Sequence, residues 1–219
     1  MSHRTESFRG LRPRGGVRAA MWLGVVLAAT AAGCGFPADG STLGELRGSL
    51  TDPPMRKPDL VLTDTEGELY DLRAETDGYL TLVFFGYTYC PDVCPVHMAT
   101  LAAAIKDLRP EVRDQTKVVF VSTDPERDTP ERLRAWLDGF DHSFIGLRGS
   151  VDEINAALAS LMLPGVAVIP SEHGAEPLIG HPAAVLAFEA DGLARVRYAF
   201  GVRRADWAHD LPMLVAGRP

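Results

Sequence analysis

Cysteine is scarce in this chain, which has three cysteines among 219 residues. Three cysteines can form at most one intramolecular pair and leave one thiol unpaired. Basic residues are outnumbered, with 22 Lys and Arg against 29 Asp and Glu, and no basic stripe offsets this balance. An acidic protein repels phosphate backbones, so nucleic acid is not an expected partner. Long apolar runs are missing as well. The run at residues 19–32 is shorter than the roughly 20 residues that span a bilayer, which argues against a permanent transmembrane helix there.

The first 33 residues have the pattern of an export signal. Five arginines precede the apolar run, and the small residues Ala31–Gly33 precede Cys34. A small-residue triplet that ends in Gly before Cys resembles a bacterial lipoprotein signal, in which the cysteine becomes the lipidated first residue. An ordinary secretory signal with Cys34 as a free thiol is the alternative. We expect a signal peptide at residues 1–33 and a protein held by a lipid on the extracytoplasmic side of a bacterial cell membrane.

The remaining chain has the size of one domain. Cleavage before Cys34 would leave 186 residues, a length typical of one domain with a substantial core. Losing five Arg and one Glu shifts the formal net charge from −7 to −11. Residues 34–57 are rich in Gly, Pro, Ser and Asp and show little periodicity, which predicts a flexible membrane tether. The folded domain is therefore predicted at residues 58–219.

Apolar periodicity in this domain alternates between strands and helices. Continuous apolar runs predict strands covered on both faces, and Thr129 and Ser150 have the character of helix N-caps. The expected order is a hairpin at 59–72, a strand at 79–85, a helix at 95–108, a strand at 117–121, helices after Thr129 and Ser150, strands at 183–188 and 193–200, and a helix at 207–215. This order predicts an α/β fold, a thioredoxin-like sandwich with a central mixed sheet, helices on both faces and an N-terminal β-hairpin.

Two of the cysteines, Cys90 and Cys94, stand four residues apart in a loop after a predicted strand. Pro95 is favoured in the first turn of a helix, so Cys94 is expected at or near the helix N-cap, where the positive helix end lowers a thiol pKa. A thiolate pair can close a disulfide or bind a soft metal ion. A purely structural disulfide is the other alternative, but so small a ring removes little entropy from the unfolded chain.

Four features resemble the Sco/SenC family, copper chaperones of cytochrome c oxidase assembly that have a thioredoxin-like fold. They are GYTYCPDVCP at residues 86–95, VSTDPERDTP at 121–130, FIGLRGS at 144–150, and a histidine, His181, just before a late strand. A CxxxC spacing alone is a weak signal, but CPDVCP with DPERDTP at this separation is specific. The resemblance covers most of the chain between residues 60 and 200.

The resemblance implies that Cys90, Cys94 and His181 hold copper, as Cu(I) and in a second state as Cu(II). Two thiolates and one imidazole suit Cu(I), whereas a structural Zn site would seek a fourth ligand. Thioredoxin-like proteins carry a cis-proline opposite the cysteine motif, and Pro182 is expected to be that residue. The family often has Asp before this histidine and Ser or Thr after it. This chain has Gly180 and Pro182 there, which leaves the hydrogen-bond partner of His181 unidentified.

The function that the resemblance implies is that of a membrane-anchored, extracytoplasmic copper chaperone. Such a protein delivers copper to the dinuclear copper site of cytochrome c oxidase subunit II, with other copper chaperones or thiol reductants as further partners. An enzyme is the alternative: a thiol-disulfide reductase, with Cys90 and Cys94 as its redox-active pair, would keep the target cysteines reduced. The CxxxC spacing in place of the CxxC of dedicated thioredoxins counts against an enzyme.

Other residues near the motif have competing interpretations. His97 lies one helical turn after Cys94 and could replace His181 as the third ligand. Met98 is expected in the core, with an occasional role as a soft ligand. Asp92 is either a turn residue or a charge that tunes the thiols. The remaining candidates are expected to be structural or solvent-facing, namely Asp124 as a loop cap, Tyr87 and Tyr89 flanking the motif, Trp136 and Trp207 in the core, and His142, His173 and His209 in solvent.

Overall fold

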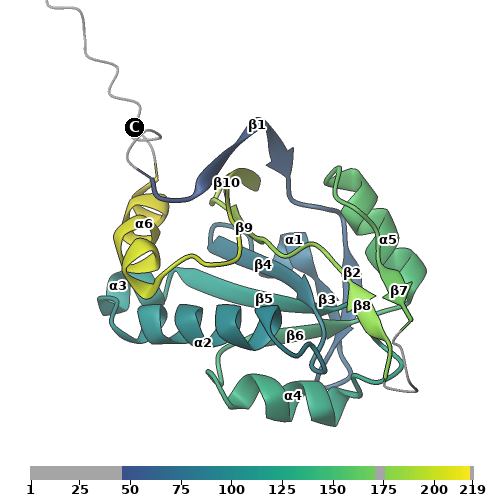
Figure 1. Ribbon diagram of the computed structural model, residues 1–219. Helices are drawn as coiled ribbons and strands as arrows, with labels where there is room; N and C mark the ends of the chain where they lie inside the picture. Colours follow the sequence, from purple (N-terminus) through teal and green to yellow (C-terminus); the bar gives the residue numbers. More distant parts are fainter. Residues whose placement is uncertain (1–45, 171–175, 218–219) are drawn as a thin grey trace, which may run out of the picture. The chain divides into compact units, whose positions relative to one another are not determined.

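A computed structural model describes residues 46–170 and 176–217 of the chain (Figure 1). The predicted signal peptide, Cys34, the first part of the predicted tether and His173 lie outside these residues. No helix within the described ranges combines the length and the apolar character needed to cross a membrane.

A mixed sheet of eight strands forms the centre of the domain (Figure 1). β4, β5 and β6 run parallel to one another, and the other neighbouring pairs are antiparallel. The strands lie side by side in the order β1 (Ser49–Arg56), β10 (Leu193–Tyr198), β9 (Val185–Phe188), β4 (Leu80–Gly86), β5 (Thr116–Ser122), β6 (Ile145–Arg148), β2 (Val61–Asp64) and β3 (Leu69–Asp71). A separate two-stranded sheet joins β7 (Ala167–Ile169) to β8 (Leu178–Gly180).

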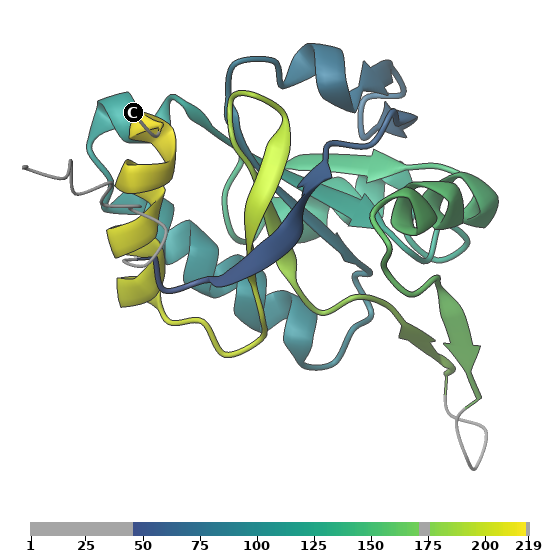
Figure 2. The same cartoon turned by 90° about the horizontal axis from the view of Figure 1, so that it is seen from above.

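Helices cover both faces of this sheet, as Figures 1 and 2 show. Side chains along β4 alternate between two cores, with Leu82 and Phe84 in one and Val83 and Phe85 in the other. The first core also contains residues of α2 (Val93–Lys106), α3 (Pro110–Arg113), α4 (Pro130–Asp138) and α6 (Arg204–Ala216), and the second contains residues of α1 (Leu72–Glu75) and α5 (Val151–Ser160). Burial on both faces explains why the strand sequence is a continuous apolar run.

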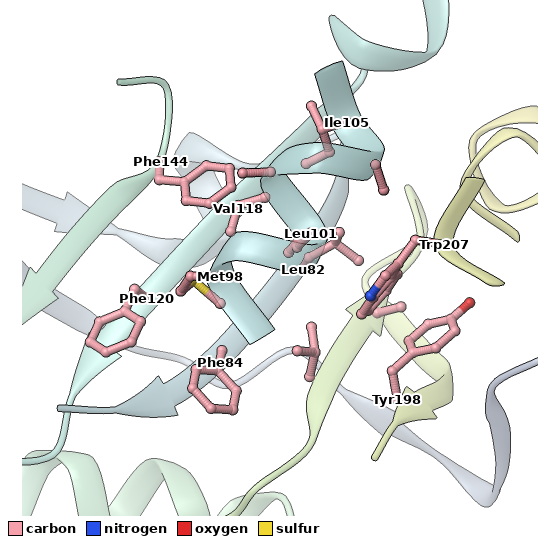
Figure 3. Close-up of a cluster of buried hydrophobic side chains, with 14 of the residues drawn as sticks. Leu82, Phe84, Met98, Leu101, Ile105, Val118, Phe120, Phe144, Tyr198 and Trp207 are labelled. Atoms are coloured by element: carbon pink, nitrogen blue, oxygen red, sulfur yellow. The ribbon is translucent and has the colours of Figure 1, made fainter. Parts of the chain in front are cut away.

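The larger core fixes α2 against the sheet (Figure 3). Met98 and Leu101 on α2 are fully buried beside Phe84, which confirms the predicted core position of Met98. Trp207 on α6 packs its ring against Tyr198, with 4.1 Å between the ring centroids. Because α2 begins at the cysteine motif, this packing also fixes where the motif lies.

Most predicted elements are present. The early hairpin is β2 and β3, and the predicted helix starts are confirmed by their caps. The Thr129 side chain accepts a hydrogen bond from the Arg132 amide, and Ser150 forms a capping box with Glu153 at the start of α5. The mixed sheet with helices on both faces agrees with the predicted fold class.

The prediction that the chain lacks regular structure up to Lys57 was wrong over its last part. Ser49–Arg56 forms β1, which pairs antiparallel with β10 at the edge of the sheet. Two prolines and a register shift between Leu50 and Met55 interrupt the strand, and such features are confined to sheet edges. Most of its residues face solvent, so no apolar alternation marked the strand in the sequence.

Lys57, directly after β1, buries its ammonium group and donates hydrogen bonds to Thr76 and Thr81. Burial lowers the pKa of Lys57 from 10.5 to about 8. Below pH 8 the folded protein therefore carries a penalty for a buried charge. As the pH rises from 8 towards 10.5, the folded state releases the proton while the unfolded state still binds it, so the protein gains stability.

We expect the free energy of unfolding of the wild type to rise between pH 8 and 10, relative to Lys57→Met, by about 1–2 kcal/mol. Urea denaturation of both proteins at each pH measures this difference. The methionine variant keeps the aliphatic stem and removes the ammonium group, so it serves as the reference. A constant difference between the two proteins across this range would contradict the assigned pKa shift.

Candidate metal centre

The cysteine motif lies at the edge where β4 and β5 end. The last residues of these parallel strands, Gly86 and Ser122, are partners in register, so the loops that follow both strands emerge side by side. The loop after β4 carries Cys90, and the loop after β5 carries the DPERDTP motif. A third segment, which leads from β8 into β9, brings His181 to the same place.

Cys94 lies in the first turn of α2, which begins at Val93 with Asp92 as its N-cap. The helix therefore starts two residues earlier than a start at Pro95 would give. Asp92 makes no side-chain capping hydrogen bond within the described residues. Instead, the backbone amide of Cys94 donates to the sulfur of Cys90 at 3.4 Å. The thiol of Cys90 thus accepts a hydrogen bond from one of the free amides at the helix start.

Three ligand atoms converge at this edge of the sheet. The sulfurs of Cys90 and Cys94 and a ring nitrogen of His181 all lie within 4.8 Å of one another. The sulfur of Cys94 is 3.5 Å from Nε2 of His181, and both thiols are free. Cys90 and Cys94 are buried, whereas His181 is partly exposed. Within the described residues this is the one group of three His, Cys, Asp or Glu side chains with such a spacing.

The ring of His181 is oriented by its own neighbour. Nδ1 lies 3.0 Å from the carbonyl oxygen of Pro182, which can only accept, so Nδ1 carries the proton and Nε2 is free to bind a metal. The rings of Phe84 and Tyr87 meet the imidazole edge-on, with centroids 5.9 and 5.6 Å away. The partner that the sequence left unidentified is therefore a backbone carbonyl.

A comparison with known protein families identifies the family of this chain. A family model described as SCO1/SenC matches residues 50–216. The chain belongs to the SCO1/SenC family. Protein SenC of Rhodobacter capsulatus is 45% identical over 78 residues, which are 36% of this chain and 35% of the relative. The matched stretches cover between 25% and 56% of the curated relatives' own lengths.

Solved structures of Sco proteins share the fold. ScoI of Bradyrhizobium japonicum, whose structure has copper bound, matches with a TM-score of 0.64 and 29% identity over 73% of this chain and 99% of that chain. Apo Sco1 of Thermus thermophilus matches with a TM-score of 0.66 and 29% identity over 77% of this chain and 96% of that chain. Both the predicted family and the predicted thioredoxin-like fold are confirmed.

In this SCO1/SenC chain, Pro182 does not have the conformation that the sequence analysis expected. The one cis peptide bond among the described residues is Asp52–Pro53, so the bond between His181 and Pro182 is trans. The prediction of a cis-proline was therefore wrong, although the segment does face the cysteines. The carbonyl of Pro182 orients His181, so this proline contributes its backbone oxygen to the site.

The prediction of a lowered pKa for Cys94 was wrong. Cys94 was expected to be the thiolate, but burial raises its pKa above the ordinary value. The pKa of Cys90 is lowered, because its sulfur accepts a hydrogen bond from the Cys94 thiol, and two backbone amides also stabilise the thiolate. The helix start therefore activates the sulfur of the preceding loop rather than the sulfur in the helix.

His97, the rival third ligand, is not part of the cluster of ligand atoms. Its Nε2 donates to the carbonyl oxygen of Ala183 at 3.1 Å, and its ring contacts Phe84 and Phe200. Burial lowers the pKa of His97, so the imidazole is neutral. His97 therefore ties α2 to the segment that carries His181.

The residues that flank the motif have structural roles. The hydroxyl of the buried Tyr87 accepts a hydrogen bond from the Ile179 amide in β8. Tyr89 is exposed, with the guanidinium of Arg132 3.7 Å from its ring centroid. Asp92 faces solvent. Asp124 caps its loop as predicted, since its carbonyl accepts from two amides and its carboxylate pairs with Arg127.

The remaining candidates lie away from the three ligands. Trp136 packs against Phe120, with 5.0 Å between centroids, as predicted for a core position. His142 is exposed and pairs with Asp138. His209 is half-buried because its ring hydrogen-bonds to Asp210, so the prediction of a solvent-facing residue was only partly right. The sequence analysis did not single out Asp128, although the DPERDTP motif contains it.

Gly86 has no side chain because the cysteine sulfur occupies that space. A Cβ at Gly86 would lie 2.8 Å from the sulfur of Cys94 and 2.9 Å from the ring of Phe84, and both are fully buried. We expect Gly86→Ala to destabilise the protein by about 1–3 kcal/mol, because overpacking forces buried neighbours to move. We also expect weaker copper binding, measured by competition with a Cu(I) chelator, since the sulfur must shift.

Gly146→Ala is the matched control, because its Cβ would meet Leu137 at 2.8 Å in the core without touching either cysteine. This variant should lose comparable stability in urea denaturation and keep the copper affinity of the wild type. Equal copper affinities in the two variants would contradict the predicted displacement of the sulfur.

Proposed function

We propose that this protein is a copper carrier that holds one copper ion through Cys90, Cys94 and His181. The observation that carries the proposal is the convergence of two free thiols and an imidazole nitrogen within 4.8 Å. Soft sulfur ligands and imidazole suit Cu(I), which accepts low coordination numbers, and the added nitrogen also suits Cu(II). A structural zinc site would take four ligands, and the described part of the chain offers three at this place.

The site is arranged for release as well as for binding. Ligand exchange requires that an incoming thiolate can reach the ion, and His181 is the partly exposed member of the set. This histidine comes from a loop between two short strands, whereas Cys94 is fixed in the core by α2. The exposed side of the site is thus the loop side, where functional residues in such folds commonly lie.

The recipient in this proposal is the dinuclear copper site of cytochrome c oxidase subunit II, and other copper chaperones or thiol reductants supply the copper or keep the thiols reduced. The resemblance of the motifs to those of the Sco/SenC family supports this assignment. The acidic composition supports a protein partner rather than nucleic acid.

The carrier is proposed to be anchored to the extracytoplasmic face of the cell membrane through lipid on Cys34. The basic, apolar and small-residue pattern of residues 1–33 supports removal of a signal peptide before this cysteine. Cys34→Ala should move the protein from the membrane fraction to the soluble fraction. Retention of the variant in washed membranes would contradict a lipid anchor at this residue.

Transfer of copper tests the chaperone function directly. Copper-loaded protein is mixed anaerobically with a soluble, metal-free fragment of subunit II, and the two proteins are separated. The proposal predicts that copper, measured by metal analysis, moves to the subunit II fraction. A fragment that stays empty while the loaded protein keeps its copper would overturn the delivery step.

A thiol-disulfide reductase is the second candidate, because the low pKa of Cys90 beside a second free thiol also suits disulfide exchange. In that case Cys90 would attack the disulfide of oxidised subunit II, and Cys94 would then displace the target thiol and leave a Cys90–Cys94 disulfide. The metal-free reduced protein should then reduce subunit II without any copper. Failure to do so, together with copper transfer, would leave the carrier as the function.

A further inference from the structure

A buried carboxylate from another segment of the chain hydrogen-bonds to the loop that carries Cys90. Asp128, in the loop between β5 and α4, has no exposed surface. Its two oxygens lie 3.2 and 3.1 Å from the backbone amide of Thr88, and one of them accepts from the Thr88 hydroxyl at 2.6 Å. The other oxygen accepts from the Ser122 hydroxyl at 2.6 Å. Asp128 therefore joins the end of β5 to the loop that follows β4.

Thr88 is also held from the outside. Nε of Arg132, in the first turn of α4, donates to the Thr88 hydroxyl oxygen at 2.7 Å. The guanidinium of the same arginine covers the ring of Tyr89 at 3.7 Å. The two residues before Cys90 therefore contact both the DPERDTP segment, through Asp128, and the helix that follows it, through Arg132.

Stability alone does not explain why a carboxylate is buried at this place. Burying a carboxylate is unfavourable, and hydrogen bonds from Thr88 and Ser122 offset that cost only in part. Replacing buried charged groups by well-packed apolar residues is often neutral or stabilising. The carboxylate instead supplies two acceptors with defined directions, which an apolar side chain cannot do. Two of its three donor groups, the amide and the hydroxyl of Thr88, lie two residues before a ligand.

We propose that Asp128 is a positioning residue of the copper site, which holds Thr88 so that the sulfur of Cys90 faces Cys94 and His181. The proposal rests on the copper-carrier function proposed above. Among the described residues, Asp128 hydrogen-bonds to Thr88 and Ser122 and to none of the three ligands, so it acts through the loop. Without it, Thr88 loses the acceptor for its amide, and the two thiols are no longer held at the spacing that a copper ion requires.

The chain contains a matched control at the other end of the domain. Asp210 on α6 is also fully buried, and it accepts hydrogen bonds from the Arg47 and Gly48 amides and from the Tyr198 hydroxyl. Asp210→Asn and Asp128→Asn therefore make the same chemical change in two buried networks. Only Asp128 is connected to the loop of the cysteine motif.

The test compares wild type, Asp128→Asn and Asp210→Asn in three measurements. These are Cu(I) affinity by competition with a chelator, the Cu(II)–thiolate absorption spectrum, and amide hydrogen exchange of the metal-free reduced protein. We expect Asp128→Asn to bind Cu(I) about 10-fold more weakly, the lower end of the range for loss of a ligand's own hydrogen-bond partner, because Asp128 acts through Thr88. Its absorption band should shift, and the amide of Thr88 should exchange faster. Asp210→Asn should have the Cu(I) affinity, the absorption spectrum and the Thr88 amide exchange rate of the wild type.

Wild-type copper affinity and spectrum in a folded Asp128→Asn would overturn the positioning role. Equal losses of copper affinity in both variants would overturn it too, because a general loss of stability would then be the cause. If Asp128→Asn does not fold, Thr88→Val removes the hydroxyl contact with Asp128 and must show the same loss and shift. A wild-type protein that binds no copper but retains the protected Thr88 amide would instead refute the copper-carrier function.

Discussion

Replacing His181 with alanine weakens copper binding by at least about 100-fold, because removal of a ligand costs more than removal of a ligand's hydrogen-bond partner, which costs about 10–100-fold. The variant keeps the two thiols, so it still binds Cu(I) weakly through Cys90 and Cys94. Binding of Cu(II) suffers more, since imidazole is the ligand in this set that suits the divalent ion. Competition titration with a Cu(I) chelator, and the Cu(II)–thiolate absorption band, measure the two effects.

Two other histidines give controls for this prediction. His142 is exposed, pairs with Asp138 and is not part of the cluster of ligand atoms, so His142→Ala should bind copper like the wild type. His97→Ala should have a smaller effect than His181→Ala, because His97 contacts the neighbouring carbonyl of Ala183 rather than the ligand group. Loss of copper in His97→Ala that is as complete as in His181→Ala would contradict the assignment of the third ligand.

The alkylation rate of Cys90 in the metal-free, reduced protein stays nearly constant between pH 8 and pH 6. An ordinary thiol with a pKa near 8.5 loses about 100-fold in rate over this range, because only the thiolate reacts. The pKa of Cys90 lies well below the ordinary value, since the Cys94 thiol donates a hydrogen bond to its sulfur. A group with a lowered pKa keeps its charge as the pH falls, so the thiolate persists. Mass spectrometry after timed reaction with iodoacetamide measures the rate.

Cys94 is the internal control in the same experiment. Its sulfur has no exposed surface, whereas Cys90 has 8% of its surface exposed, and burial raises the pKa of Cys94. We therefore expect label on Cys90 alone over this pH range. Label on Cys94, or a rate at Cys90 that falls tenfold per pH unit, would contradict the roles assigned to the two thiols.

The central part of the fold could be predicted from local sequence patterns. A run of apolar residues before the cysteine motif has one explanation, a strand covered on both faces, and β4 confirms it. The N-cap character of Thr129 and Ser150 is equally local, since each side chain bonds to the amide three residues later. These signals depend on near neighbours in the chain, and tertiary contacts do not override them here.

Other features depend on residues that are distant in sequence. β1 is recognisable as a strand only through its pairing with β10, about 140 residues later. The sequence analysis gave the lowered pKa to Cys94, whereas the structure gives it to Cys90. The amide of Cys94 points at the sulfur of Cys90, and its direction is set by the loop and not by the helix alone. Asp128 also escaped notice, since a buried carboxylate in a polar loop motif looks like an ordinary turn residue.

The most direct test of the copper-carrier account is an anaerobic Cu(I) titration of the reduced protein, with wild type and Cys90→Ser/Cys94→Ser side by side. The account predicts one tightly bound Cu(I) per chain in the wild type and none in the double variant, with both proteins folded to the same extent. A wild type that binds no Cu(I), or a double variant that binds it as tightly as the wild type, would contradict the central claim that these two sulfurs hold copper.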